Sequence, residues 1–337
     1  MIDLYIAKHI HIYVYRSRNG RDEEMNELVY NYTGAVKPQQ TLSLDLFNSF
    51  IDYLDTTEKT VRTYKTSLGQ FFKYLAAENI NKPTREDVIA YRESLKETGH
   101  KPTTVQSYIT AVKLFFTWTS LNGLYPNIAD HVKGAKISHE HKKDYLTEEQ
   151  VKNVLAGIDR STTQGARDYA MIALMVTGGL RDIEVSRANI EDLQTAAKNR
   201  VLYIQGKGKD EKADYIILSE DAEEAITEYL KTREGADLAE PLFVSLSNNS
   251  TGARLSTRSI SGTVKARMKA AGYDSDRLTA HSLRHTAITL SLKAGMKLDE
   301  VQEFARHANI NTTMIYNHSL RKENNGCSRA VSSMIFG

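Results

Sequence analysis

The chain has 337 residues, about twice the length of a typical domain, so two domains are expected. Its 41% apolar and 26% charged residues are typical of proteins with buried cores, and they exclude a disordered or fibrous chain. The net charge is only +2, so any binding of nucleic acid must be inferred from where the charges lie.

Three further features bear on the class and location of the protein. No run of eighteen or more apolar residues is present, so we do not expect a membrane span. The N-terminal segment lacks the basic start and the unbroken apolar stretch of a secretory signal. The single cysteine, Cys327, cannot form an internal disulfide. These features together favour a cytoplasmic protein.

The first part of the chain divides into an extension and a helical segment. Residues 1–41 form an N-terminal extension of unknown role, with an alternating pattern at 9–15 that suits a short strand. Over residues 42–130 the apolar side chains recur at helical spacing in four successive segments. Thr84 marks the start of the third of these helices and Gly99 its end. Short loops between the helices predict a small all-α bundle.

A polar stretch, residues 131–146, interrupts the helical periodicity and is interpreted as a linker between domains. It carries four candidate DNA-contacting lysines: Lys133, Lys136, Lys142 and Lys143. The alternative is that these lysines only keep the tether solvated.

A second domain, residues 147–337, begins at Thr147, where Gln150 completes a capping box. Its pattern is mainly helical, with two strand-like segments, 200–205 and 213–219, joined as a hairpin. The fold class predicted for the whole chain is therefore mainly α with a small β-hairpin or sheet. An all-α bundle is followed by a mixed α/β domain.

The candidate catalytic residues lie in the second domain. Arg181 follows two glycines at a helix start, where its guanidinium can face a phosphate. The hairpin tip GKGK carries Lys207 and Lys209. His281 and Arg284, three positions apart in HSLRHT, share one helix face near the N-terminal turn, which favours anions.

The last of these segments places His307 nine residues before Tyr316. Taken singly, each feature has a simple structural explanation, such as a surface arginine, a solvated turn or a buried tyrosine. Together, in this order and spacing, the two arginines, the lysine, the two histidines and the tyrosine resemble the tyrosine recombinases. That family includes phage and conjugative-transposon integrases and the Xer-type recombinases. The resemblance covers about residues 42–325, and HSLRHT with a downstream tyrosine is its most specific part.

The resemblance implies a helical core-binding domain followed by a catalytic domain that cuts and rejoins DNA through a 3′-phosphotyrosine. It also implies which groups are catalytic: Arg181, Lys207, His281, Arg284, His307 and Tyr316. The arginines would hold the scissile phosphate, since fixed cations stabilise its growing negative charge. Tyr316 would attack, with His281 as the candidate base because tyrosine has a pKa near 10. Lys207 would protonate the leaving 5′-oxygen.

The same resemblance also bears on the roles of three other residues. Lys209 is an alternative general acid, because it flanks the same glycine as Lys207. Glu184 matches an acidic position that supports the site. Arg306 departs from the family pattern, which has glycine before the second histidine. The backbone either tolerates this arginine or uses it for a further DNA contact.

The scheme needs no metal and no other cofactor, since the chain has neither a two-metal carboxylate cluster nor a phosphate-binding GxxxxGK[ST] loop. The expected partner is a double-stranded recombination site. Exchange between two duplexes implies a synaptic tetramer, and the apolar C-terminal tail could link subunits. Two alternatives remain open: a type IB topoisomerase, and a non-catalytic DNA-binding accessory protein. The target sequence and the biological role do not follow from the residues.

Overall fold

The computed structural model describes most of the chain: residues 41–136, 144–206, 208–209, 211–323 and 326–336. The chain divides into two compact units, unit 1 (residues 1–137) and unit 2 (residues 138–337). The expected strand at 9–15, and Lys142, Lys143 and Lys207, lie outside the described residues.

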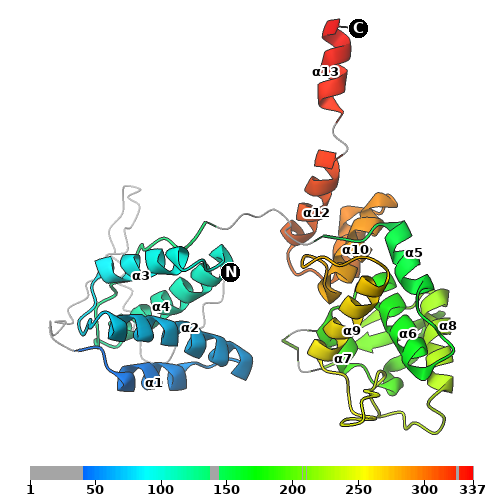
Figure 1. Cartoon of the computed structure of the whole chain (residues 1–337), viewed down its shortest axis with the longest axis horizontal. Helices are drawn as coiled ribbons and strands as arrows, with labels where there is room; N and C mark the ends of the chain where they lie inside the picture. The colour runs from blue at the N-terminus through cyan, green and yellow to red at the C-terminus, as the bar shows by residue number, and fades with distance from the viewer. Residues whose placement is uncertain (1–40, 137–143, 207, 210, 324–325, 337) are drawn as a thin grey trace, which may run out of the picture. The chain divides into compact units, whose positions relative to one another are not determined.

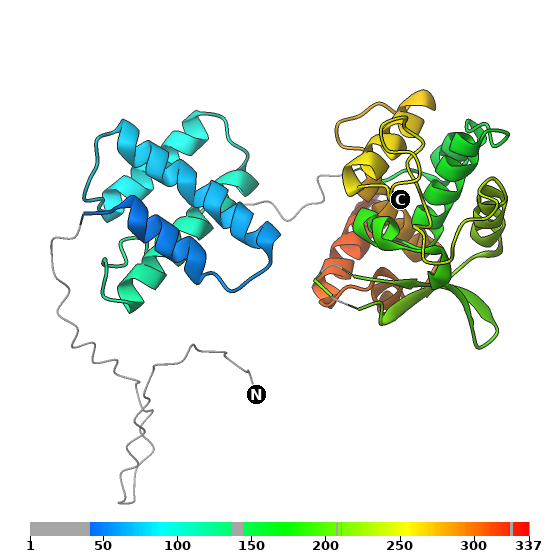
Figure 2. The same cartoon turned by 90° about the horizontal axis from the view of Figure 1, so that it is seen from below.

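Unit 1 contains the four helices that the apolar spacing predicts. They are α1 (Leu44–Tyr53), α2 (Glu58–Ala77), α3 (Arg85–Glu97) and α4 (Pro102–Leu121). Side chains satisfy free N–H groups at their starts: Ser43 accepts from Leu46 and Thr57 accepts from Thr60. Figures 1 and 2 show two layers, α1 with α2 and α3 with α4. Aromatic rings fill the space between them, and Phe71 is fully buried.

Unit 2 carries the remaining helices and all the strands of the described chain. Its first helices are α5 (Glu148–Ala156), α6 (Thr163–Thr177) and α7 (Asp182–Arg187), followed by the short 3-10 helix η1 (Ile190–Asp192). The strands are β1 (Leu193–Ala196), β2 (Asn199–Ile204) and β3 (Asp214–Ile217). The last helices are α8 (Glu220–Lys231), α9 (Thr257–Ala270), α10 (Ala280–Lys293), α11 (Leu298–Ala305), α12 (Ile310–Glu323) and α13 (Cys327–Phe336).

The strands form one antiparallel sheet in the order β1-β2-β3. The hairpin predicted from the sequence corresponds to β2 and β3, where Val201 lies opposite Ile217. The predicted small β-hairpin or sheet is confirmed as a sheet, in which β1, a strand that the sequence pattern did not locate, pairs with the other edge of β2. Only four residues long and half polar, β1 gives no clear alternation, and it joins β2 through Ala197 in the left-handed conformation.

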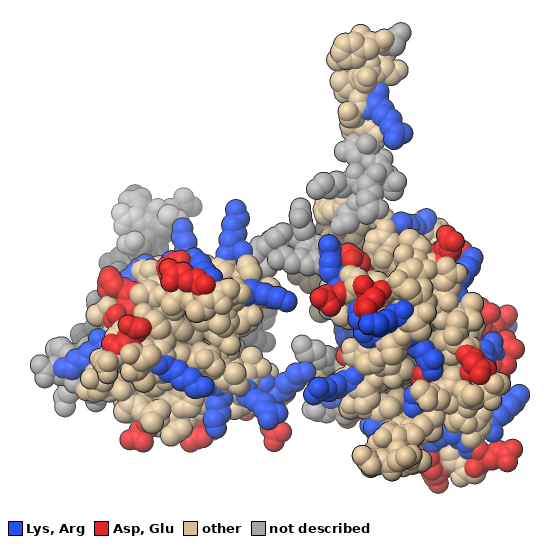
Figure 3. All heavy atoms as spheres, viewed as in Figure 1, with Lys and Arg blue, Asp and Glu red and all other residues tan. Residues whose placement is uncertain are grey.

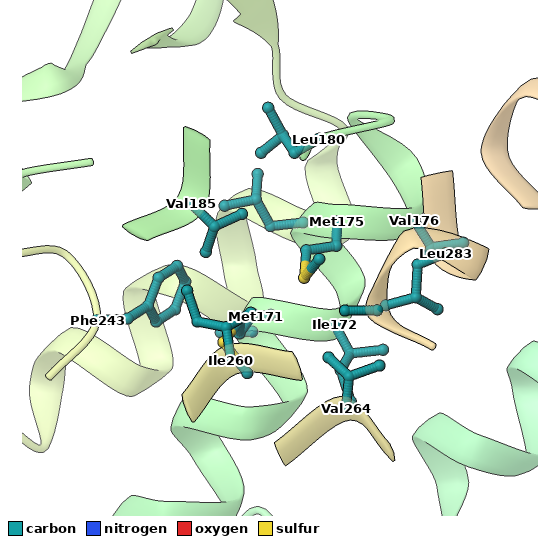
Figure 4. Packing of buried hydrophobic residues seen from close by; sticks show 14 of the residues in the cluster. Met171, Ile172, Met175, Val176, Leu180, Val185, Phe243, Ile260, Val264 and Leu283 are labelled. Carbon is teal, nitrogen blue, oxygen red and sulfur yellow. The ribbon is translucent and has the colours of Figure 1, made fainter. Parts of the chain in front are cut away.

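Helix α6 lies at the centre of unit 2 and is buried on nearly every side. Figure 4 shows its side chains, among them Met171 and Ile172, packed against residues of α7, α9 and α10. The helix ends at Gly178, and Gly179 follows with a positive φ of 57°. A Cβ on Gly179 would lie 2.9 Å from the Phe304 ring of α11, so only glycine lets these elements approach so closely.

Charged side chains are mixed over the surface of both units. Figure 3 shows lysines and arginines interspersed with acidic residues on the visible face of each. Within the described part of the chain, no helix is both long and apolar enough to cross a membrane.

The central position of α6 predicts a large effect of truncating its core side chains. We expect Leu174→Ala, at a fully buried position, to lower the free energy of unfolding of unit 2 by about 2–5 kcal/mol, because the lost methyl groups leave a cavity. Denaturant unfolding measures this change. The matched control is Leu238→Ala, whose side chain is 65% exposed and which should change stability by less than about 0.5 kcal/mol.

Candidate active site

Tyr316 lies on α12 in a small core between α10, α11 and α12. Its side chain is only 6% exposed and packs with Ile288, Val301 and Ala305. Its hydroxyl is hydrogen-bonded to Nδ1 of His285, a buried residue of α10. Burial raises the pKa of Tyr316 to about 12, although the charges of Arg284 and Arg181 act in the opposite direction. The hydroxyl is therefore protonated at neutral pH.

Two more histidine rings lie beside this pair. The exposed His281 ring meets that of His285 edge-on, with the ring centroids 4.5 Å apart. The His307 ring is stacked on that of Tyr316 at a centroid distance of 6.3 Å, and its Nδ1 is 2.9 Å from Oγ1 of Thr313. Burial, reinforced by the charges of Arg284 and Arg181, lowers the pKa of His307 to about 4. His307 is therefore neutral at physiological pH.

Arg284 is almost completely buried, at 1% exposure, and is held by backbone carbonyls. Its Nη1 donates to the oxygen of Gly179 at 2.6 Å, and its Nη2 donates to that of Ala305. The end of α6 thus meets the end of α11 at this guanidinium. Burial, together with the nearby charges of Arg181 and Arg306, lowers the pKa of Arg284.

Arg181 is the N-cap residue of α7, where Glu184 anchors it twice. Its backbone N–H donates to Oε2 of Glu184 at 2.8 Å, and its Nη1 donates to Oε1 at 2.7 Å. Glu184 is 1% exposed, and burial alone would favour its neutral form. The charge of Arg306 and the contacts with Arg181 outweigh burial and keep the pKa of Glu184 below its ordinary value.

Arg306 reaches the same carboxylate from the end of α11. Its Nη2 donates to Oε2 of Glu184 and to the oxygen of Gly179, both at 3.1 Å. Its backbone is left-handed, with φ 53° and ψ 46°. Glycine adopts this conformation more easily than any other residue, which explains why an arginine at this position is a departure.

Unit 2 therefore brings together six residues that were singled out from the sequence: Arg181, Glu184, His281, Arg284, His307 and Tyr316. Of the lysines, Lys209 lies exposed between β2 and β3, while Lys133 and Lys136 are exposed in unit 1. The residue that sequence reasoning missed is His285. The signal for it is HSLRHT itself, in which His285 directly follows Arg284. Over the described residues, no cluster of three or more metal-ligating side chains occurs.

The sequence matches two family descriptions in the order of the two units. Residues 47–123 match "Phage integrase, N-terminal SAM-like domain", and residues 144–323 match "Phage integrase family". The second match spans more than half of the chain. The chain belongs to the phage integrase family. It is a site-specific tyrosine recombinase with the two-domain architecture predicted from the sequence.

Named relatives agree with this assignment. The recombinase is 30% identical to tyrosine recombinase XerC of Thermodesulfovibrio yellowstonii, over 77% of this chain and 85% of that protein. It is also 30% identical to tyrosine recombinase XerA of Pyrococcus horikoshii, over 82% of this chain and 90% of that protein. These comparisons give no support to the topoisomerase or accessory-protein alternatives.

Solved structures share the fold. XerH recombinase, bound to a palindromic difH substrate in a post-cleavage complex, matches with a TM-score of 0.66 and 23% identity, over 81% of this chain and 79% of that one. The Tn1549 transposon integrase, in complex with transposon right end DNA, matches with a TM-score of 0.65 and 20% identity. That match covers 83% of this chain and 97% of the integrase.

The lowered pKa of His307 predicts acid sensitivity of the fold. An unfolded histidine titrates near 6.5, whereas His307 in the folded protein titrates near 4. Between these values the unfolded state binds more protons, so stability is complete above about pH 6.5 and falls as the pH drops towards 4. In thermal unfolding, His307→Gln should show a smaller loss of Tm across this window. The exposed His318→Gln serves as control, and an unchanged pH slope in His307→Gln would contradict the assignment.

Proposed function

We propose that this recombinase cuts and rejoins DNA through a 3′-phosphotyrosine formed at Tyr316. The observation that supports this most strongly is the convergence of Tyr316 with two arginines, Arg181 and Arg284, from distant parts of the sequence. A nucleophile beside fixed cations is what attack on a phosphodiester requires. In the proposed step Oη of Tyr316 bonds to phosphorus while the bond to the 5′-oxygen breaks. The reverse step rejoins the strand without any nucleotide cofactor.

Arg181 and Arg284 are assigned to binding the scissile phosphate. Negative charge grows on its oxygens as the tyrosine adds, and guanidinium groups provide paired hydrogen bonds and charge at that place. Arg181 is the more accessible of the two, with 26% of its side chain exposed. Removing one such donor typically slows the chemical step by about a hundred- to a thousandfold.

The proton of Tyr316 needs an acceptor, and the histidines are the candidates. His285 is already hydrogen-bonded to the hydroxyl, so we assign it the task of holding the nucleophile before reaction. His281, the base proposed from the sequence, is one ring further away and is exposed. We assign it as the acceptor of the Tyr316 proton in the cleavage step.

Protonation of the leaving 5′-oxygen is assigned to Lys207, with Lys209 as the alternative. Both belong to the segment between β2 and β3. Arg187 steadies the start of this segment by donating to the carbonyl of Gly206 at 3.1 Å.

Unit 1 is assigned to DNA binding, as a core-binding domain at about residues 42–130, with the catalytic domain at 147–337. A hollow between α2 and α4 is lined by Arg62 and by hydroxyl side chains such as Thr66, Thr103 and Ser107. Such groups bind phosphates and base edges. The lysines of the linker, 131–146, would add phosphate contacts. The DNA complexes of XerH and the Tn1549 integrase support this assignment.

Strand exchange between two duplexes requires four cuts, so we propose that four subunits assemble on paired sites. The tail helix α13 has no buried residue and exposes Val331, Met334, Ile335 and Phe336. Burying this apolar face against a neighbouring subunit would link the assembly. Integration or excision of a mobile element is the proposed biological role.

The first test is removal of the nucleophilic oxygen. A pool of nicked duplexes with randomised sequence is offered to the wild-type protein, and covalently trapped DNA is recovered; we call it the recovered duplex. Tyr316→Phe should bind this duplex with wild-type affinity, because only the hydroxyl is lost. It should give no covalent band on a denaturing gel, and a band would refute the assignment of Tyr316.

The second test concerns the leaving group. Lys207→Ala should slow cleavage of the recovered duplex, because the 5′-oxygen would have to leave without a proton. Replacing that oxygen with sulfur makes a leaving group that needs no acid, so the rate should be restored. Lys209→Ala is the matched control and should need no rescue. If sulfur rescues Lys209→Ala instead, the acid is Lys209.

A further inference from the structure

Arg306 occupies a backbone conformation that does not suit it. Among the described residues it is one of four that are not glycine and have a positive φ. A side chain in the left-handed region crowds the following carbonyl, and glycine avoids this cost. An arginine at this position needs a compensating contribution from its side chain, and its contacts indicate what that contribution is.

Its guanidinium faces inward and uses both terminal nitrogens. Nη1 donates to the oxygens of Phe304 at 2.8 Å and Gly178 at 3.5 Å. Nη2 donates to the oxygen of Gly179 and to Oε2 of Glu184. Only 11% of the side chain is exposed, and its buried Nε has no partner among the described atoms. With its terminal N–H groups committed, Arg306 has little left to offer a phosphate directly.

Among the described residues, the ion-pair partner of Arg306 is Glu184, so its effect on the charge of the site passes through that carboxylate. Oε1 of this carboxylate accepts from the side chain of Arg181. Its Oε2 accepts from Arg306 and from the backbone N–H of Arg181. Without Arg306, the full negative charge of Glu184 would act on Arg181. With Arg306 the cluster of Arg181, Arg284, Arg306 and Glu184 holds three guanidinium groups and one carboxylate, a net charge of +2.

The net charge of this cluster is equal and opposite to the charge that the phosphate carries during attack. A phosphodiester has one negative charge, and addition of a tyrosinate gives it a second. We propose that Arg306 is a positioning residue: it binds Glu184, and thereby fixes the guanidinium of Arg181 and preserves its positive charge towards the phosphate. The proposal rests on the proposed function, since it assumes phosphoryl transfer at Tyr316.

The test uses the whole chain and the recovered duplex. Arg306→Gly removes the side chain but keeps a residue suited to the left-handed backbone. We expect covalent adduct to form about ten- to a hundredfold more slowly, by analogy with the loss of groups that orient the ligands of metal sites. The affinity for the duplex should stay nearly unchanged. Arg306→Lys keeps the charge and should recover part of the rate.

The control is another inward-facing arginine of unit 2, outside this cluster. Arg233 donates to the carbonyls of Pro241 and Leu242 and to Glu240. Arg233→Ala removes comparable contacts, so the adduct rate of the folded protein should stay at the wild-type level. Thermal unfolding of each variant restricts the comparison to folded protein.

A double-mutant cycle separates positioning from general support of the fold. If Arg306 acts through Glu184, its loss should matter less once that carboxylate is neutral. In a Glu184→Gln background, we expect Arg306→Gly to slow adduct formation by less than about threefold. A wild-type rate in Arg306→Gly, or an equal loss in both backgrounds, would overturn the proposal. A wild-type protein that forms no adduct refutes the proposed function instead.

Discussion

A buried carboxylate, that of Glu184, determines how the positive charge of the site is arranged. An ionised carboxylate out of contact with water costs several kcal/mol unless cations and hydrogen bonds surround it. Glu184 obtains both from Arg181 and Arg306, which lie far apart in the sequence of unit 2. Because the carboxylate needs these partners, the fold brings together guanidinium groups that would otherwise repel one another. The site therefore consists of guanidinium groups arranged around the carboxylate of Glu184.

The end of α6 is the second anchor of this arrangement. The carbonyl of Gly179 accepts from both Arg284 and Arg306, at the terminus where a helix carries partial negative charge. Helix α6 is itself fixed on nearly all sides by the core shown in Figure 4. The apolar packing of unit 2 therefore also positions its arginines, because displacing α6 would displace the carbonyl that accepts from two guanidinium groups.

The sequence predicted what depends on neighbours along the chain. Apolar spacing located the four helices of unit 1, a capping box located the start of α5, and the motif residues marked the site. It could not predict contacts set by packing between distant segments. The bond between Tyr316 and His285 depends on how α12 packs against α10, and the reach of Arg306 to Glu184 crosses 122 residues of sequence. Strand β1 escaped detection because its order comes from pairing with β2 rather than from its own alternation.

A cell contains many phosphate esters besides DNA, including nucleotides and phosphorylated metabolites, and a reactive tyrosine would be a hazard among them. Burial raises the pKa of Tyr316 to about 12, so its hydroxyl is protonated at pH 7. Its ring lies beside the rings of His285 and His307. A small ester that diffuses to the site meets a neutral, hydrogen-bonded hydroxyl. In the unbound recombinase, burial thus keeps the Tyr316 hydroxyl in its protonated, less nucleophilic form.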